Sequence, residues 1–188
     1  MNRALAILCF AALVGCGDNH KTMSSGNLPE GWTAGDAVPH DQIYSDPPDS
    51  PAATRIQFYG LMEGDPGHRL YSIPADTPIA EVVKAFEVGS HGSMSYGYES
   101  GATVNLVADK ATKISEIIPC RITFADPAGL KLRFSRQVTE DHLKQIEALF
   151  PEEEVMQAGL ERYLSEWDGE SSILAPVLQE NLFHFWWD

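Results

Sequence analysis

The chain has 188 residues and carries 13 basic and 27 acidic side chains, for a formal net charge of −14. Nucleic acid and anionic lipid head groups are therefore excluded as expected partners, because both are polyanions. The charge is uneven, with six basic and two acidic residues in 110–136 but two basic and twelve acidic residues in 137–188. Two interpretations stay open: a basic sheet surface and acidic helices offset each other within one fold, or an acidic face binds a basic partner.

The N-terminal residues have the pattern of an export signal. An apolar run from Ala4 to Val14 follows the basic residue Arg3. The run is shorter than the roughly 20 residues that span a bilayer, but it fits the apolar region of a signal peptide. It ends at Leu13-Val14-Gly15-Cys16, which resembles the lipobox of bacterial lipoproteins. The alternative is a plain secretory signal followed by a chance cysteine.

The lipobox resemblance covers residues 1–16 only. It implies cleavage before Cys16, diacylglyceryl attachment to the Cys16 sulfur and acylation of the new amino terminus. Several acyl chains hold a protein firmly on a membrane. Gly17, in the position where Asp retains enteric lipoproteins at the inner membrane, resembles the outer-membrane address. The expected location is therefore the bacterial cell envelope, lipid-anchored, at the outer membrane.

Composition divides the chain into three parts: a signal peptide (1–15), a lipidated N-terminus and flexible tether (16–54), and an α+β globular domain (55–188). The tether lacks an apolar period and is rich in Pro, Gly, Ser and Asp, including DPPDSP at 46–51. Its aromatic residues, Trp32 and Tyr44, are candidates to dock on the domain. Of the cysteines, Cys120 alone remains in the domain, so no internal disulfide is expected.

The domain is expected to begin with a hairpin and a helix. Residues 55–62 alternate, with Ile56 and Phe58 on one face, and a Gly/Pro turn at 63–67 leads into a second strand. A helix is then expected between Thr77, as N-cap, and Gly89. Its apolar stripe is formed by Ile79, Val82, Val83 and Phe86.

The Gly/Ser/Tyr stretch at 89–101 has two interpretations. Alternation of Tyr96 and Tyr98 with small residues predicts a strand that turns into a second strand at 103–109. The composition also resembles adaptable binding loops, in which Tyr supplies contact area and Gly and Ser supply flexibility. Tyr96 and Tyr98 are therefore candidate binding residues.

Residues 118–134 show the clearest hairpin pattern. Ile118, Cys120, Ile122 and Phe124 are expected to point inward from the first strand, and Leu130, Leu132 and Phe134 from the second. Asp126-Pro127-Ala128-Gly129 suits a type I turn. Cys120 is then expected to act as a small core hydrophobe.

The C-terminal part has helical spacing. Thr139 is expected to cap a helix that ends at Pro151, and further helices are expected over 152–167 and from Ser171 onward. The order ββαββββααα predicts an α+β fold of antiparallel hairpins, with the C-terminal helices packed on the sheet.

Motifs of catalysis are largely missing from the sequence. It contains no G-x-S-x-G, no H-E-x-x-H, no paired-cysteine motif and no phosphate-binding glycine loop, so neither a metal nor a cofactor is expected. His91 is the one candidate catalytic residue, as a base near Ser90, Ser93 or Glu99. The alternative is an exposed loop histidine.

The C-terminal FHFWWD places five aromatic residues in a row, which cannot all point one way on a helix. Three interpretations are open: a terminal helix that covers the core, a surface for a partner, or contact with lipid. Aromatic residues are enriched at the centres of interfaces. The candidate binding residues are Phe183, Phe185, Trp186 and Trp187.

These features favour a non-enzymatic binding module that binds an envelope protein partner, for instance as an immunity-type inhibitor or an assembly accessory. One alternative is an envelope hydrolase whose site, including His91, is assembled from distant residues. Another is a small-molecule-binding lipoprotein with a pocket near Tyr96, Tyr98 and the C-terminal rings.

The lipobox gives a first testable prediction. Cys16→Ser should abolish both signal cleavage and labelling with radioactive palmitate, because serine cannot form the thioether. Labelling is read from gels of cells that express the wild type or the variant. Cys120→Ser is the matched control and should label normally. Undiminished labelling of Cys16→Ser would refute the lipobox assignment.

Overall fold

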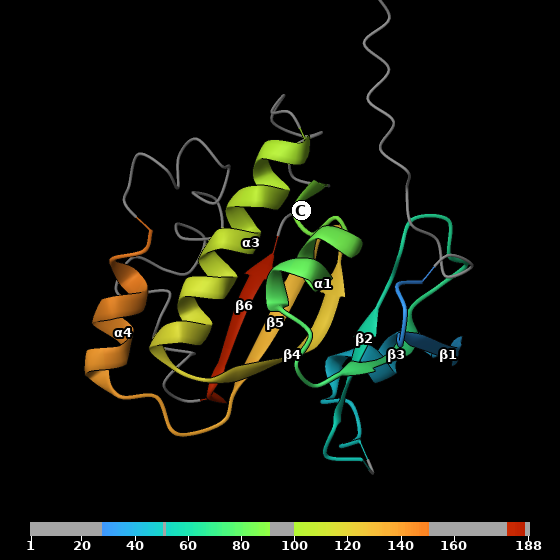
Figure 1. The fold of residues 1–188 in the computed structure, drawn as a ribbon, viewed down its shortest axis with the longest axis horizontal. Helices are drawn as coiled ribbons and strands as arrows, with labels where there is room; N and C mark the ends of the chain where they lie inside the picture. The colour runs from blue at the N-terminus through green and yellow to red at the C-terminus, as the bar shows by residue number, and fades with distance from the viewer. Residues whose placement is uncertain (1–27, 51, 91–99, 151–179, 187–188) are drawn as a thin grey trace, which may run out of the picture.

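The fold belongs to the α+β class, as predicted. A computed structural model describes residues 28–50, 52–90, 100–150 and 180–186. One mixed sheet has the strand order β1-β3-β2-β4-β5-β6, and α1 and α3 lie on one of its faces (Figure 1). Within these ranges, no helix is long and apolar enough to cross a membrane.

The elements have the following bounds. The strands are β1 (Thr33–Ala37), β2 (Arg55–Gly60), β3 (Arg69–Pro74), β4 (Cys120–Asp126), β5 (Gly129–Phe134) and β6 (Leu182–Trp186). The helices are the 3-10 helix η1 (His40–Tyr44) and the α-helices α1 (Ile79–Ala85), α3 (Ser100–Ile117) and α4 (Glu140–Glu147).

Both predicted strand hairpins at 55–74 and 118–134 form. β2 pairs antiparallel with β3, and β4 pairs antiparallel with β5. The β4–β5 turn is closed by Asp126, whose Oδ1 accepts a hydrogen bond from the Ala128 amide at 2.8 Å. Such a local side-chain bond to the backbone is typical of turns that begin with Asp.

One inward residue of the second hairpin was predicted wrongly. The register of β4 against β5 shifts between Ile122 and Phe124, which marks a β-bulge. A bulge adds one residue to a strand and so reverses the alternation beyond it. Ile122 therefore packs in the core beneath the helices, whereas Phe124 packs on the opposite face with Tyr59 and Ile43.

Two of the predicted helices are confirmed. In α4, the Thr139 hydroxyl accepts from the His142 amide, and the Thr139 amide donates to the His142 ring, so the cap is reciprocal. α1 forms where expected, but it begins after Pro78 without a side-chain cap, so Thr77 is not its N-cap. The helix expected over 152–167 lies outside the described residues.

The strand expected over 103–109 is part of α3 instead. Its buried apolar residues are Val104, Val107, Ala108, Ala111 and Ile114. They recur every three or four positions, which is the helical period rather than the strand period. The pattern becomes clear only when the window extends beyond Asp109, and this explains the wrong prediction.

The helix expected at the C-terminal end is strand β6 over its last residues. β6 pairs antiparallel with β5, with Phe183 opposite Leu132 and Phe185 opposite Leu130. Phe183 and Phe185, two positions apart, are both buried, so burial in this segment follows the two-residue period of a strand. The aromatic residues favour a strand when a partner strand is present, and β5 supplies it.

Part of the predicted tether belongs to the sheet. β1 pairs antiparallel with β3, and Trp32, just before β1, is 8% exposed and stacks on Phe86 at 6.4 Å between ring centroids. Ile43 of η1 is also buried. Isolated apolar residues can thus dock a segment that lacks any apolar period, because Phe86 and the outer side of the sheet supply the complementary surface.

The two antiparallel parts of the sheet join where β2 runs parallel to β4. Gly60 pairs there with Ala125, and the Phe86 ring lies directly above it. A Cβ at position 60 would lie 2.5 Å from Phe86 Cε1 and 2.8 Å from the Ala125 carbonyl oxygen. Glycine is therefore required by close packing at this junction.

This close packing predicts that Gly60→Ala lowers the free energy of unfolding by about 1–3 kcal/mol, the usual cost of overpacking a core. Urea unfolding followed by circular dichroism measures the change. Gly67→Ala is the matched control, because a Cβ there meets no atom within 4 Å. Equal unfolding midpoints for the two variants would contradict the proposed packing constraint.

Candidate functional site

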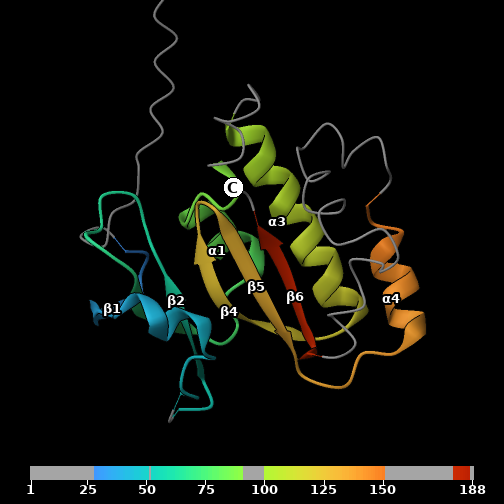
Figure 2. The same cartoon turned by 180° about the vertical axis from the view of Figure 1, so that it is seen from behind.

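The face of the sheet opposite α1 and α3, here called the outer face, carries a basic cluster of Arg121, Lys131 and Arg133. Arg121 on β4 is the register partner of Arg133 on β5, and Lys131 lies two residues before Arg133. Figure 2 shows β4, β5 and β6 in front of α1 and α3 on this side. Like charges opposite each other destabilise a strand pair, so the cluster needs negative counter-charges.

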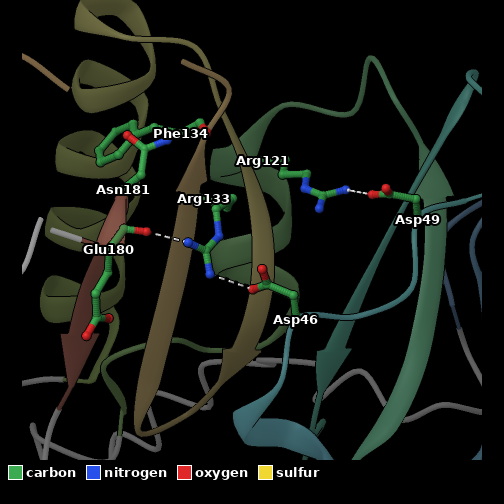
Figure 3. Close-up of polar contacts among 7 residues, drawn as sticks. All are labelled: Asp46, Asp49, Arg121, Arg133, Phe134, Glu180 and Asn181. Atoms are coloured by element: carbon green, nitrogen blue, oxygen red, sulfur yellow. Dashed lines mark hydrogen bonds and ion pairs between the residues drawn. The ribbon is translucent and has the colours of Figure 1, made fainter. Parts of the chain in front are cut away.

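The counter-charges come from a distant part of the chain. Residues 45–50, here called the acidic segment, belong to the connection between β1 and β2. An Asp46 carboxylate oxygen lies 2.8 Å from Arg133 Nη2, and an Asp49 carboxylate oxygen lies 2.5 Å from Arg121 Nη1 (Figure 3). Each arginine of the opposed pair is thus neutralised by its own aspartate.

Arg133 is also held by the strand next to it. Its Nη1 donates to the backbone carbonyl of Glu180, just before β6 (Figure 3). Beside it, the side-chain Nδ2 of Asn181 donates to the Phe134 backbone carbonyl at 2.9 Å, and the side-chain Oδ1 of Asn181 accepts from the Val138 backbone N–H at 3.1 Å. These contacts fix the start of β6 against β5 and position the Arg133 guanidinium.

A small apolar cluster holds the connection on the outer face. Ile43 of η1 is 5% exposed and packs with Tyr59 and Phe124. Gln42 donates to the Tyr59 hydroxyl at 3.0 Å. The connection is therefore fixed at η1, and the acidic segment extends from that point toward β4 and β5.

Lys131 lies close to two aromatic rings on the outer face. Its Nζ is 5.6 Å from the Tyr44 ring centroid and 5.4 Å from the Phe124 ring centroid, within the range of cation–π attraction. Burial lowers the pKa of Lys131, while the nearby carboxylates of Asp46 and Asp126 act in the opposite direction.

His184 on β6 is the register partner of Lys131. Burial, together with the Lys131 charge, lowers the pKa of His184 to about 4. The His184 imidazole is therefore neutral at pH 7, and it adds no positive charge to the basic cluster.

A histidine–carboxylate pair lies at the other end of β4. His68 Nε2 is 3.1 Å from Asp126 Oδ2, and the Phe124 ring centroid is 5.5 Å from the His68 ring centroid. The His40 ring centroid is 6.2 Å away, and the Tyr44 hydroxyl binds His40 Nε2 at 2.9 Å. Because Asp126 also closes the β4–β5 turn, the pair ties this turn to the residue before β3.

Groups that could support catalysis or hold a metal are few in the described ranges. No group of three or more His, Cys, Asp or Glu side chains is placed there to bind a metal ion. Burial raises the pKa of the Cys120 thiol to about 12, so it stays protonated and is a poor nucleophile. Cys120 packs against the core, in agreement with the sequence prediction.

The structure places only some of the residues predicted to form a site. Phe183 and Phe185 lie in the core and contact the Phe150 ring, so the folded domain does not offer them to a partner. Trp186 ends β6 opposite Gly129. Five predicted site residues lie outside the described part of the chain: Cys16, His91, Tyr96, Tyr98 and Trp187.

The basic cluster was not identified as a site from the sequence, although two signals were present. Residues 110–136 are rich in basic residues, and the hairpin alternation turns Lys131 and Arg133 away from the core. Nothing in the sequence links these residues to Asp46 and Asp49, which are 87 and 72 positions away from Arg133 and Arg121.

Comparison with models of protein families, with curated proteins and with solved structures gives no match for this chain.

The lowered pKa of His184 predicts a pH-dependent stability. In the unfolded chain its pKa is about 6.5. Between pH 6.5 and 4 the unfolded state therefore binds more protons than the folded state, and acid destabilises the fold. We expect His184→Gln to lose less stability than the wild type between pH 7 and pH 4.5.

Urea unfolding at a series of pH values measures this difference. Gln145→Ala at an exposed position is the control, because it removes no titratable group and its pH profile should run parallel to that of the wild type. A His184→Gln profile that is also parallel to the wild type would show that His184 is not buried in its neutral form.

Proposed function

We propose that this protein is a lipid-anchored cell-envelope protein whose globular domain binds an envelope protein partner and catalyses no reaction. The lipobox at residues 13–16 supports the anchor at Cys16, and Gly17 supports the outer membrane as its location. An anchored domain acts only on molecules that come to that membrane, which suits an inhibitor or an assembly accessory.

One observation carries the binding role: the basic cluster on the outer face. Arg121 and Arg133 keep 35% and 28% of their side chains exposed although each is ion-paired. No described α-helix lies over this part of the sheet (Figure 2). Arginine side chains with exposed planar groups are frequent at protein interfaces, where they provide directional hydrogen bonds.

The sheet face offers a binding surface of mixed character. Lys131 lies close to two aromatic rings, and one of them belongs to Tyr44, which is 67% exposed. Tyrosine and arginine are both enriched at protein interfaces. A partner is thus expected to present carboxylates to the arginines and an apolar group to Tyr44.

The hydrolase alternative has less support in the described residues. The His68–Asp126 pair resembles two members of a catalytic triad, but its ring neighbours are Phe124 and His40, and among the described residues the nearby Tyr44 hydroxyl bonds to His40 rather than to His68. Both Asp126 oxygens are engaged, one by His68 and the other by the turn. The pair is explained by its structural role.

The binding role can be tested with residues 17–188, which lack the signal peptide and the lipidated Cys16, immobilised and incubated with envelope extract from the source organism. We expect quantitative mass spectrometry to identify one protein that the wild type retains and that Arg121→Gln/Arg133→Gln does not. The matched control is Lys84→Gln/Arg136→Gln, which removes the same charge from exposed positions outside the basic cluster. It should retain that protein.

Two results would contradict the proposed function. One is that no protein is retained by the wild type. The other is equal retention by all three forms, which would place any binding away from the outer face. Circular dichroism of each variant verifies that the fold is intact.

A further inference from the structure

We infer that the acidic segment is an internal ligand of the basic cluster, and that the partner binds the same cluster through an acidic, extended peptide segment that displaces it. The inference rests on the proposed function and names the chemistry of the partner. It follows from how the acidic segment is held, from its conformation and from the spacing of its carboxylates.

The acidic segment is held weakly at its charged positions. Asp46 keeps 45% and Asp49 keeps 84% of its side chain exposed, although both are ion-paired. Ion pairs that are this exposed contribute little to stability. The buried residues of the connection are Ile43 and, between the two aspartates, Pro47. Displacement of Asp46 and Asp49 from the arginines therefore also exposes Pro47, while Ile43 keeps η1 in place.

The sequence of the segment favours an extended backbone. Ser45 is extended, with φ −91° and ψ 158°, and Pro47 and Pro48 follow between the two aspartates. Proline restricts the backbone to φ near −65°, which favours the polyproline II helix. Proline-rich segments in this conformation are common ligands because they lose little entropy on binding.

The spacing of the carboxylates matches the arginines. A polyproline II helix has three residues per turn, so residues three apart, such as Asp46 and Asp49, point to the same side. Their targets, Arg133 and Arg121, are register partners on adjacent strands. A partner segment with two acidic residues three positions apart, separated by residues that favour an extended backbone, would fit the cluster in the same way.

Repulsion among the three cations of the basic cluster explains why it can accept an acidic ligand. The two opposed arginines and Lys131 have like charge, so removal of Asp46 and Asp49 leaves three cations close together. An incoming pair of carboxylates relieves this repulsion as the internal ones do. The acidic segment therefore raises the affinity that a partner needs, because the partner must compete with a ligand that the same chain holds nearby at high effective concentration.

The test measures binding of a fluorescein-labelled peptide that copies residues 44–50 to the chain of residues 17–188. Fluorescence polarisation gives the dissociation constant. Asp46→Asn/Asp49→Asn should bind the peptide about tenfold more tightly than the wild type, because the internal competitor is lost. Asp36→Asn/Asp76→Asn changes the net charge equally at exposed positions and should bind like the wild type.

Further variants identify the surface and the ligand class. Addition of Arg121→Gln/Arg133→Gln to Asp46→Asn/Asp49→Asn should remove the gain in affinity. Asp46→Glu/Asp49→Glu, which keeps the charge, should bind like the wild type. Inorganic phosphate should displace the labelled peptide far less effectively than the unlabelled peptide does. Effective displacement by phosphate would show a site for small anions and overturn the peptide assignment.

The inference is overturned if Asp46→Asn/Asp49→Asn binds no more tightly than Asp36→Asn/Asp76→Asn. Thermal melts show whether each variant is folded, and the single Asp49→Asn, at the more exposed position, replaces the double variant if the latter unfolds. This failure is separate from that of the proposed function. A partner captured from envelope extract without any gain in peptide affinity would overturn the inference alone.

Discussion

The short parallel pairing of β2 with β4 determines both faces of this sheet. Tyr59 pairs with Phe124 and Gly60 with Ala125, and this joins the antiparallel set β1-β3-β2 to the antiparallel set β4-β5-β6. On the helix side, the absence of a side chain at Gly60 lets Phe86 pack against the joint. On the outer face, Tyr59 and Phe124 form the surface on which Ile43 is buried. The position of the β1–β2 connection, and so that of the acidic segment, depends on the same two residue pairs.

The bulge in β4 turns Phe124 to the outer face of the sheet. Without it, strict alternation would turn Phe124 toward the helices and leave the outer side of β4 without a large apolar residue. With it, the rings of Phe124 and Tyr44 both lie within cation–π distance of the Lys131 ammonium. An acidic protein thus keeps a compact group of cations on one face, each placed by a strand rather than by a loop. Positions fixed by strands are better suited to specific recognition than positions on mobile loops.

Local signals in the sequence were sufficient to predict the elements whose stabilising contacts are close in sequence. The two hairpins at 55–74 and 118–134 have turn residues between alternating strands, and α4 has a capping threonine, so each was predicted correctly. β1 and β6 depend on distant strands, β3 and β5, and no local pattern shows this pairing. The outward direction of Lys131 and Arg133 follows from alternation alone. Their aspartate partners do not, because that contact depends on where a long connection crosses the finished sheet.

The way the chain enters the sheet also decides how the domain responds to mechanical load. The Arg55 guanidinium donates to the Gly31 carbonyl at 2.9 Å, and the Trp32 ring stacks on Phe86 in the core. β1, which follows, is an edge strand on the opposite end of the sheet from β6. Tension on the preceding residues is therefore transmitted into the core at Gly31 and Trp32 before it reaches η1. The arginines of β4 and β5 lie toward the other end of the sheet from this point of entry.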